Sequence, residues 1–62
     1  MKYRVYQIDL ADNATMLIEF SEEDRAKMFR TMMYACDEKE REEYERLGRL
    51  VESYRYVIIP IA

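Results

Sequence analysis

Residues Ser21 to Val51 have the sequence SEEDRAKMFRTMMYACDEKEREEYERLGRLV, which is typical of an α-helical segment. Ser21 is a favourable N-cap residue, and three acidic side chains follow it, where the positive end of a helix dipole favours negative charge. We therefore expect a helix to begin directly after Ser21. Apolar side chains then recur at spacings of three and four, the pattern of one helix face: Met28, Phe29, Met32, Met33, Cys36, Tyr44, Leu47 and Val51.

The charged run from Asp37 to Glu43 interrupts this apolar face and leaves two interpretations open. One continuous helix would be about 46 Å long, against about 26 Å for an eight-residue strand. It would extend beyond the sheet, and its far end would need another chain. Alternatively, Asp37 begins a second helix, because Asp37 and Glu40 have the spacing of a capping box. We favour the break near Asp37, with Gly48 inside the second helix or near its end.

The segments on either side of this helical region have the composition of β-strands. Tyr3 to Leu10 and Ala14 to Phe20 are rich in β-branched and aromatic residues, and turn-forming residues separate them. These two segments predict a β-hairpin. Tyr54 to Ile59 predicts a third strand, which ends at Pro60 because proline cannot donate a backbone hydrogen bond.

Together these elements predict an α+β fold in one domain, residues 1–62. It consists of a β-hairpin, two helices broken near Asp37 and a third strand. The three-stranded sheet has the order 2-1-3, with the helices on one face. The direction of the third strand relative to the first stays open, because it depends on how often the helical region reverses the chain.

The predicted strands carry apolar side chains on both faces, whereas one helical layer covers only one face. The uncovered face would present tyrosine, arginine and isoleucine, and tyrosine and arginine are enriched in protein interfaces. We therefore predict an interaction surface on the first and third strands, formed by Tyr3, Arg4, Tyr6, Tyr54, Arg55 and Tyr56. The same tyrosines could stack with bases, so a single-stranded nucleic-acid-binding protein is the alternative.

The charge and hydropathy of the chain limit the classes of partner that it is expected to bind. The chain has 13 acidic and 10 basic side chains, a net charge of −3, and no basic stripe. Nucleic acid is therefore an unfavoured partner. The N-terminus lacks the apolar segment of a signal peptide, and no apolar run has the length of a membrane span. We expect a cytoplasmic protein with no membrane partner.

The residue types needed for catalysis or metal binding are scarce. The chain has no histidine, one cysteine and one glycine. A Cys/His zinc site, an intrachain disulfide and a glycine-rich phosphate loop are therefore excluded. We expect Cys36 to be a buried, unreactive thiol, and the glutamates between Glu38 and Glu45 to form a solvated helix face. No catalytic residue, metal or cofactor is predicted, so the protein is not expected to be an enzyme.

The small size of the chain favours association. A single core in 62 residues contributes little net stability, and small domains usually gain more from disulfides, metals or another chain. The first two are excluded by composition. A homodimer, or a tight complex with a protein partner, is therefore expected.

Residues 3–8, Tyr-Arg-Val-Tyr-Gln-Ile, resemble the opening strand of the YodL-like small domains of bacterial mobile-element accessory proteins. The resemblance covers about eight residues and brings no catalytic residues. It implies a phage or mobile-element context, in which small proteins often act by covering a host protein. The resulting hypothesis is a non-enzymatic protein–protein interaction module that binds and occludes a host protein.

Overall fold

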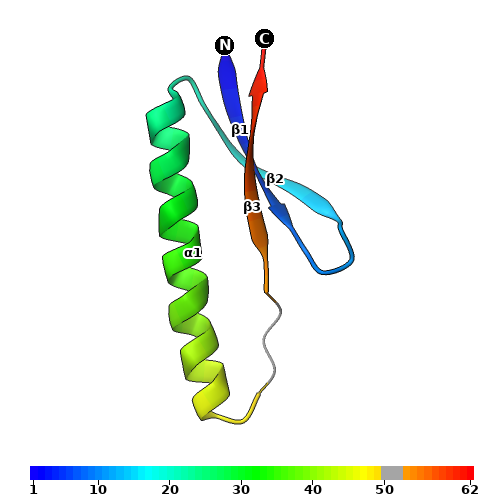
Figure 1. The fold of residues 1–62 in the computed structure, drawn as a ribbon, viewed down its shortest axis with the longest axis vertical. Helices are drawn as coiled ribbons and strands as arrows, with labels where there is room; N and C mark the ends of the chain where they lie inside the picture. Colours follow the sequence, from blue (N-terminus) through cyan, green and yellow to red (C-terminus); the bar gives the residue numbers. More distant parts are fainter. Residues whose placement is uncertain (50–52) are drawn as a thin grey trace.

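The computed structural model describes residues 1–49 and 53–62, and within these it shows three strands and one helix (Figure 1). The predicted α+β class is confirmed. In chain order the elements are β1 (Lys2–Ile8), β2 (Ala14–Phe20), α1 (Glu23–Arg46) and β3 (Arg55–Ile61).

The strands form an antiparallel sheet in the order β2-β1-β3, as predicted. In the centre of the sheet, Val5 lies opposite Ile18 on β2 and Ile58 on β3. The register with β2 shifts between Val5 and Tyr6, so that Tyr6 lies opposite Met16 and Leu17 is the extra residue of a bulge. The open question about strand direction is settled, because a single helix between β2 and β3 leaves β3 antiparallel to β1.

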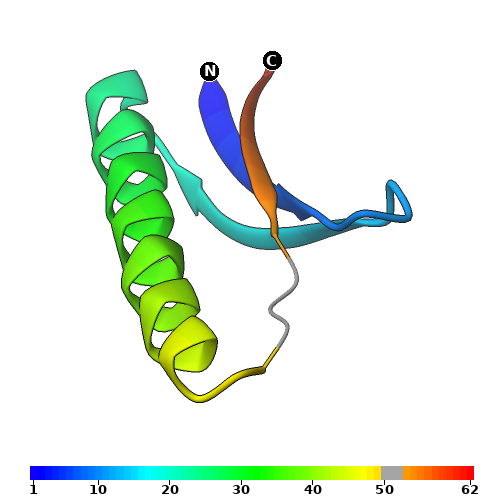
Figure 2. The same cartoon turned by 60° about the horizontal axis from the view of Figure 1, so that its bottom comes forward.

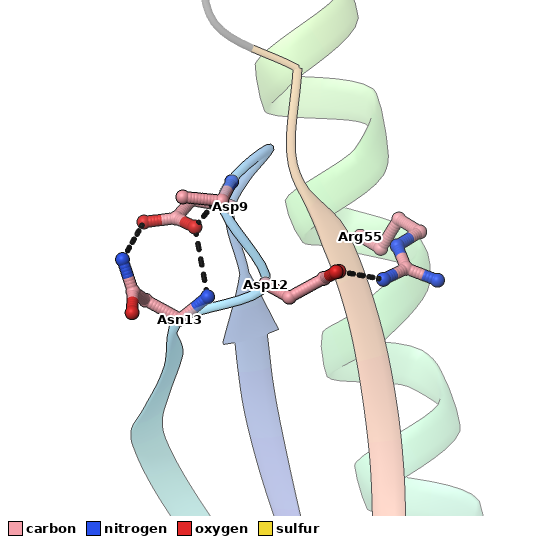
Figure 3. Close-up of polar contacts among 5 residues, drawn as sticks. Asp9, Asp12, Asn13 and Arg55 are labelled. Atoms are coloured by element: carbon pink, nitrogen blue, oxygen red, sulfur yellow. Dashed lines mark hydrogen bonds and ion pairs between the residues drawn. The ribbon is translucent and has the colours of Figure 1, made fainter.

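Asp9 organises the loop of the hairpin (Figure 3). Its Oδ1 atom accepts hydrogen bonds from the backbone N–H groups of Ala11 and Asn13, both at 2.9 Å. The bond from the Asn13 backbone is the main reason why the pKa of Asp9 lies below its ordinary value. Asp12 takes a positive φ of 62°, and its carboxylate pairs with Arg55 at 3.0 Å. The loop is thereby joined to the beginning of β3.

The prediction of two helices broken near Asp37 is wrong, because α1 is one helix of 24 residues. Asp37 does not cap a helix; its carboxylate accepts a hydrogen bond from the hydroxyl of Tyr56. The charged residues that follow it, from Glu38 to Glu43, are all exposed. The helix continues through this exposed, charged run without a covering layer, and α1 extends beyond the sheet at this end (Figure 1).

The two ends of α1 differ from the prediction in detail. The N-cap residue is Glu22, without a side-chain capping bond, so Ser21 lies one residue outside the cap. At the other end Gly48 follows the helix with φ 72°. The N–H of Gly48 donates to the carbonyl of Glu45, and the N–H of Arg49 donates to that of Tyr44. These bonds form a Schellman motif, so Gly48 ends the helix rather than lying inside it.

The core lies between α1 and one face of the sheet (Figure 2). Among the described residues, Val5, Ala26 and Tyr56 are the buried apolar side chains. Phe20 and Phe29 pack with ring centroids 5.7 Å apart. Cys36 is exposed, which contradicts the expectation of a buried thiol. It lies about 80° around the helix from Ala26, outside the covered side.

No helix in the described ranges, 1–49 and 53–62, has the length and apolar character that crossing a membrane requires.

Candidate interaction surface

The side of the sheet that faces away from α1 is the candidate functional site. Side chains alternate along a strand, and Val5 and Tyr56 are buried under α1, so their neighbours in sequence point to the opposite side. No helix or strand of the described residues covers that side (Figures 1 and 2). We call it the open face; it consists of Lys2, Arg4, Tyr6, Ile8, Met16, Glu19, Arg55, Val57, Ile59 and Ile61.

The centre of the open face is apolar. Tyr6 lies between Met16 on β2 and Val57 on β3, its partners in the sheet register. Val57, Ile59 and Ile61 form an aliphatic row along β3. Met16 is 51% exposed and Ile59 is 43% exposed. Together these side chains form an apolar strip across all three strands, part of which is exposed to solvent.

Ion pairs within the chain compensate most of the charge at both ends of this strip. At one end the Arg4 Nε atom lies 2.8 Å from Glu19 Oε1, and the Lys2 Nζ atom lies 3.4 Å from Glu19 Oε2. The hydrogen bond from Arg4 is the main reason why the pKa of Glu19 lies below its ordinary value, and the same bond raises the pKa of Arg4. At the other end Arg55 pairs with Asp12 (Figure 3).

The six predicted interaction residues do not lie on one face of the sheet. Arg4, Tyr6 and Arg55 lie on the open face, as the prediction intended. Tyr3 and Tyr56 alternate with them and lie on the side covered by α1, where Tyr56 is only 2% exposed. Tyr54 precedes β3 and lines a cavity beside α1. The apolar partners Ile8, Met16, Val57, Ile59 and Ile61 were missing from the predicted set, although they share the strand alternation of Tyr6 and Arg55.

Tyr56 instead belongs to a polar cluster that holds α1 against the sheet. Its hydroxyl donates to Asp37 Oδ2, while the side-chain amide of Gln7 donates to the same hydroxyl at 3.3 Å. Its backbone N–H donates to the Tyr34 hydroxyl at 3.0 Å, and the two rings meet edge to face. Burial, followed by the bond to Asp37, raises the pKa of Tyr56 to about 12. These contacts are structural, because they satisfy polar groups under the helix.

Along α1, the described residues line open cavities. One of about 450 Å³ separates the helix from the residues before β3, and one of about 340 Å³ lies near the chain ends. None of the side chains that line either cavity is buried. Within residues 1–49 and 53–62, no three potential metal ligands lie close enough together to hold an ion. Neither cavity therefore offers the enclosed, convergent polar groups of a typical small-molecule site.

No protein family model, no curated protein and no solved structure matches this chain. The resemblance of residues 3–8 to a YodL-like strand therefore stays a prediction. Inferences about function depend on the geometry of the open face.

Proposed function

We propose that the protein is a non-enzymatic protein–protein interaction module and that the open face is its contact surface. The observation that carries the proposal is an apolar sheet face, centred on Tyr6, that no described element covers. Exposed apolar patches with a polar rim are characteristic of protein interaction sites. Arg4 and Arg55 supply that rim, and their ion pairs remove the cost of bringing uncompensated charges into an interface.

A protein partner fits the open face better than single-stranded nucleic acid. Base stacking needs several exposed aromatic rings along a basic groove. Of the tyrosines in the strands, Tyr6 alone lies on the open face, since Tyr3 and Tyr56 lie under α1. The cations Lys2 and Arg4 share the carboxylate of Glu19, and Arg55 pairs with Asp12. The face is therefore aliphatic and close to neutral.

The resemblance of the first strand adds a context to this proposal. In a phage or mobile element, a small module with such a surface would act by covering the surface of a host protein. The exposed Cys36 has no histidine that could act as its base, because the sequence contains none.

The proposal is tested with Ile59→Glu, which places a carboxylate in the middle of the aliphatic row. Arg4 lies opposite Ile59 in the register, so the new charge has a partner within the same chain and the fold is retained. Met28→Glu is the matched control, because Met28 is 73% exposed on the outer side of α1 and the change in charge is identical. The native chain and the two variants are each immobilised, and the proteins that each retains from a bacterial lysate are compared. The self-association of the three proteins is measured separately.

We expect Ile59→Glu to lose the protein contacts of the native chain and Met28→Glu to keep them. Equal contacts for all three forms would contradict the proposal. If the native chain shifts the electrophoretic mobility of a single-stranded oligonucleotide, and the shift weakens with added salt, the result would instead favour the nucleic-acid alternative.

A further inference from the structure

We infer that the open face is the interface of a homodimer in which the sheets of two copies pack face to face. The inference rests on the proposed function, because it assigns an occupant to the same surface. In this arrangement the two-fold axis passes between the sheets, and the helices lie on the outside. Each open face then contacts its own equivalent, as in other isologous interfaces.

The exposed area of the chain is the first reason. The chain exposes 4958 Å², whereas a compact monomer of 7.6 kDa exposes about 4,300 Å². The excess is roughly 650 Å², close to the area of about 800 Å² that each partner buries in a standard interface. The charged end of α1 contributes part of this excess but needs no cover. The exposed apolar part includes Met16 and Ile59 on the open face, and Met28 and Met32 on α1.

The composition of β3 is the second reason. Tyr56, Val57, Ile58 and Ile59 form an uninterrupted apolar run, the pattern of a strand that is buried on both faces. In one chain only Tyr56 and Ile58 lie toward α1, while Val57 and Ile59 lie on the open face. A second sheet, packed about 10 Å away, would bury the other half of the run.

The distribution of charge selects the sheet rather than the helix as the dimer surface. Residues 21–52 contain ten acidic and seven basic side chains, which is the whole net charge of −3. Residues 1–20 and 53–62 contain three of each kind. Pairing two helices would bring two surfaces of larger net charge together, whereas the open face has three cations against two carboxylates, a net charge of +1, and pairing the sheets keeps the helices apart.

The self-complementary character of the face fits a second copy. Its aliphatic row on β3 and the ring of Tyr6 on β1 lie side by side, so a two-fold axis near Tyr6 places aliphatic side chains against aliphatic and aromatic ones. Each cation at the ends of the face has an ion pair within its own chain, and one positive charge remains because Lys2 and Arg4 share Glu19. A strongly charged surface on the partner is therefore not required, which is consistent with a copy of the same apolar face.

The test is the mass in solution, measured by size-exclusion chromatography with light scattering over a range of micromolar concentrations. A reducing buffer excludes a disulfide through the exposed Cys36. The native chain is expected to have twice the 7.6 kDa of one chain. The dimer dissociation constant of Ile59→Glu is expected to be at least about 100-fold higher than that of the native chain, because the substitution places a carboxylate in an apolar interface. The dimer dissociation constant of Met28→Glu is expected to stay within about threefold of that of the native chain.

A native chain that stays at 7.6 kDa overturns the inference. So does an Ile59→Glu variant that dimerises as tightly as the native chain, or a Met28→Glu variant that dissociates as readily as Ile59→Glu. Circular dichroism verifies that each variant is folded, and Val57→Lys replaces Ile59→Glu if that variant unfolds. If the native chain is monomeric but Ile59→Glu still abolishes binding of another protein, the inference fails and the proposed function stands.

Discussion

Tyr56 combines three roles at the residue scale. It is one of the buried side chains, its ring packs against Tyr34, and its hydroxyl lies between Asp37 and Gln7. A hydroxyl that is both desolvated and hydrogen-bonded to a carboxylate must keep its proton, which is why its pKa is raised to about 12. The residue therefore connects the middle of α1 to the sheet only while it is neutral.

This connection predicts a loss of stability at alkaline pH. The pKa of Tyr56 in the folded chain is about 12, above the ordinary value of 10.0. A raised pKa means that the stabilisation is complete below pH 10.0 and is lost as the pH rises toward 12. We expect the free energy of unfolding, measured with urea, to fall over this range by on the order of 2 kcal/mol more than in Tyr56→Phe.

The Tyr56→Phe variant supplies the control, because every other ionisable group is retained in it. The difference in tyrosinate absorbance between the two proteins reports Tyr56 alone, with an expected midpoint of about 12. An equal alkaline loss of stability in both proteins would show that Tyr56 is not held in its neutral form by the fold.

The positions of the tyrosines also show what sequence can predict at this scale. Strand alternation was sufficient to place Val57 and Ile59 on the same face and Tyr56 on the other. It did not indicate which of these faces the helix covers, because both are apolar. The contact between Tyr56 and Asp37 joins residues 19 apart and depends on how α1 is placed on the sheet. The predicted set also joined adjacent strand residues, such as Arg55 and Tyr56, which alternation places on opposite faces. Tyr3 and Tyr56 lie on the face that the helix covers.

At the scale of elements, α1 shows why a capping pattern is not sufficient to predict a helix break. Asp37 and Glu40 have the spacing of a capping box, but the same carboxylate is also the acceptor for Tyr56. The exposed, charged run continues the helix without cover, so the interruption of the apolar face does not end it. The strands and the hairpin were predictable because their composition, turn residues and alternation agree, and β2 has the predicted bounds, Ala14–Phe20.

Gly48 could lie inside a helix or just after its end, and the sign of the stability change caused by Gly48→Ala distinguishes these two positions. Inside a helix, Gly48→Ala would stabilise the protein by about 1 kcal/mol. At φ 72° the same change should destabilise it by about 1 kcal/mol, because an L side chain strains this conformation. No atom lies within 4 Å of the added Cβ atom, so the cost comes from the backbone alone.

Gly48→Asn is the matched comparison, because asparagine tolerates the left-handed conformation better than alanine does. We expect its free energy of unfolding to lie between those of the native chain and Gly48→Ala, as measured by urea unfolding. An alanine variant more stable than the native chain would place Gly48 inside the helix instead.

At the scale of the whole molecule, the chain separates charge from apolar surface. Residues 21–52 carry the net charge, whereas the charges of residues 1–20 and 53–62 balance and the strands have apolar side chains on both faces of the sheet. One helix can cover one of these faces, which accounts for the small number of buried side chains among the described residues. The expectation of association could be made from chain length and composition. The surface that associates could be proposed only once the side covered by α1 was known.

The central claim is that the open face is the surface through which this protein contacts another protein chain, and that this chain is a second copy. Methyl NMR spectra of a dilution series test it most directly. We expect the methyl resonances on the open face to shift with concentration: Ile8, Val57, Ile59 and Ile61. Ile18 and Ile58 are internal controls from the same sheet, since they lie on the side covered by α1 and should not shift. Spectra that do not change with concentration, or that change only at Met28 and Met32 on the outside of α1, would contradict the claim.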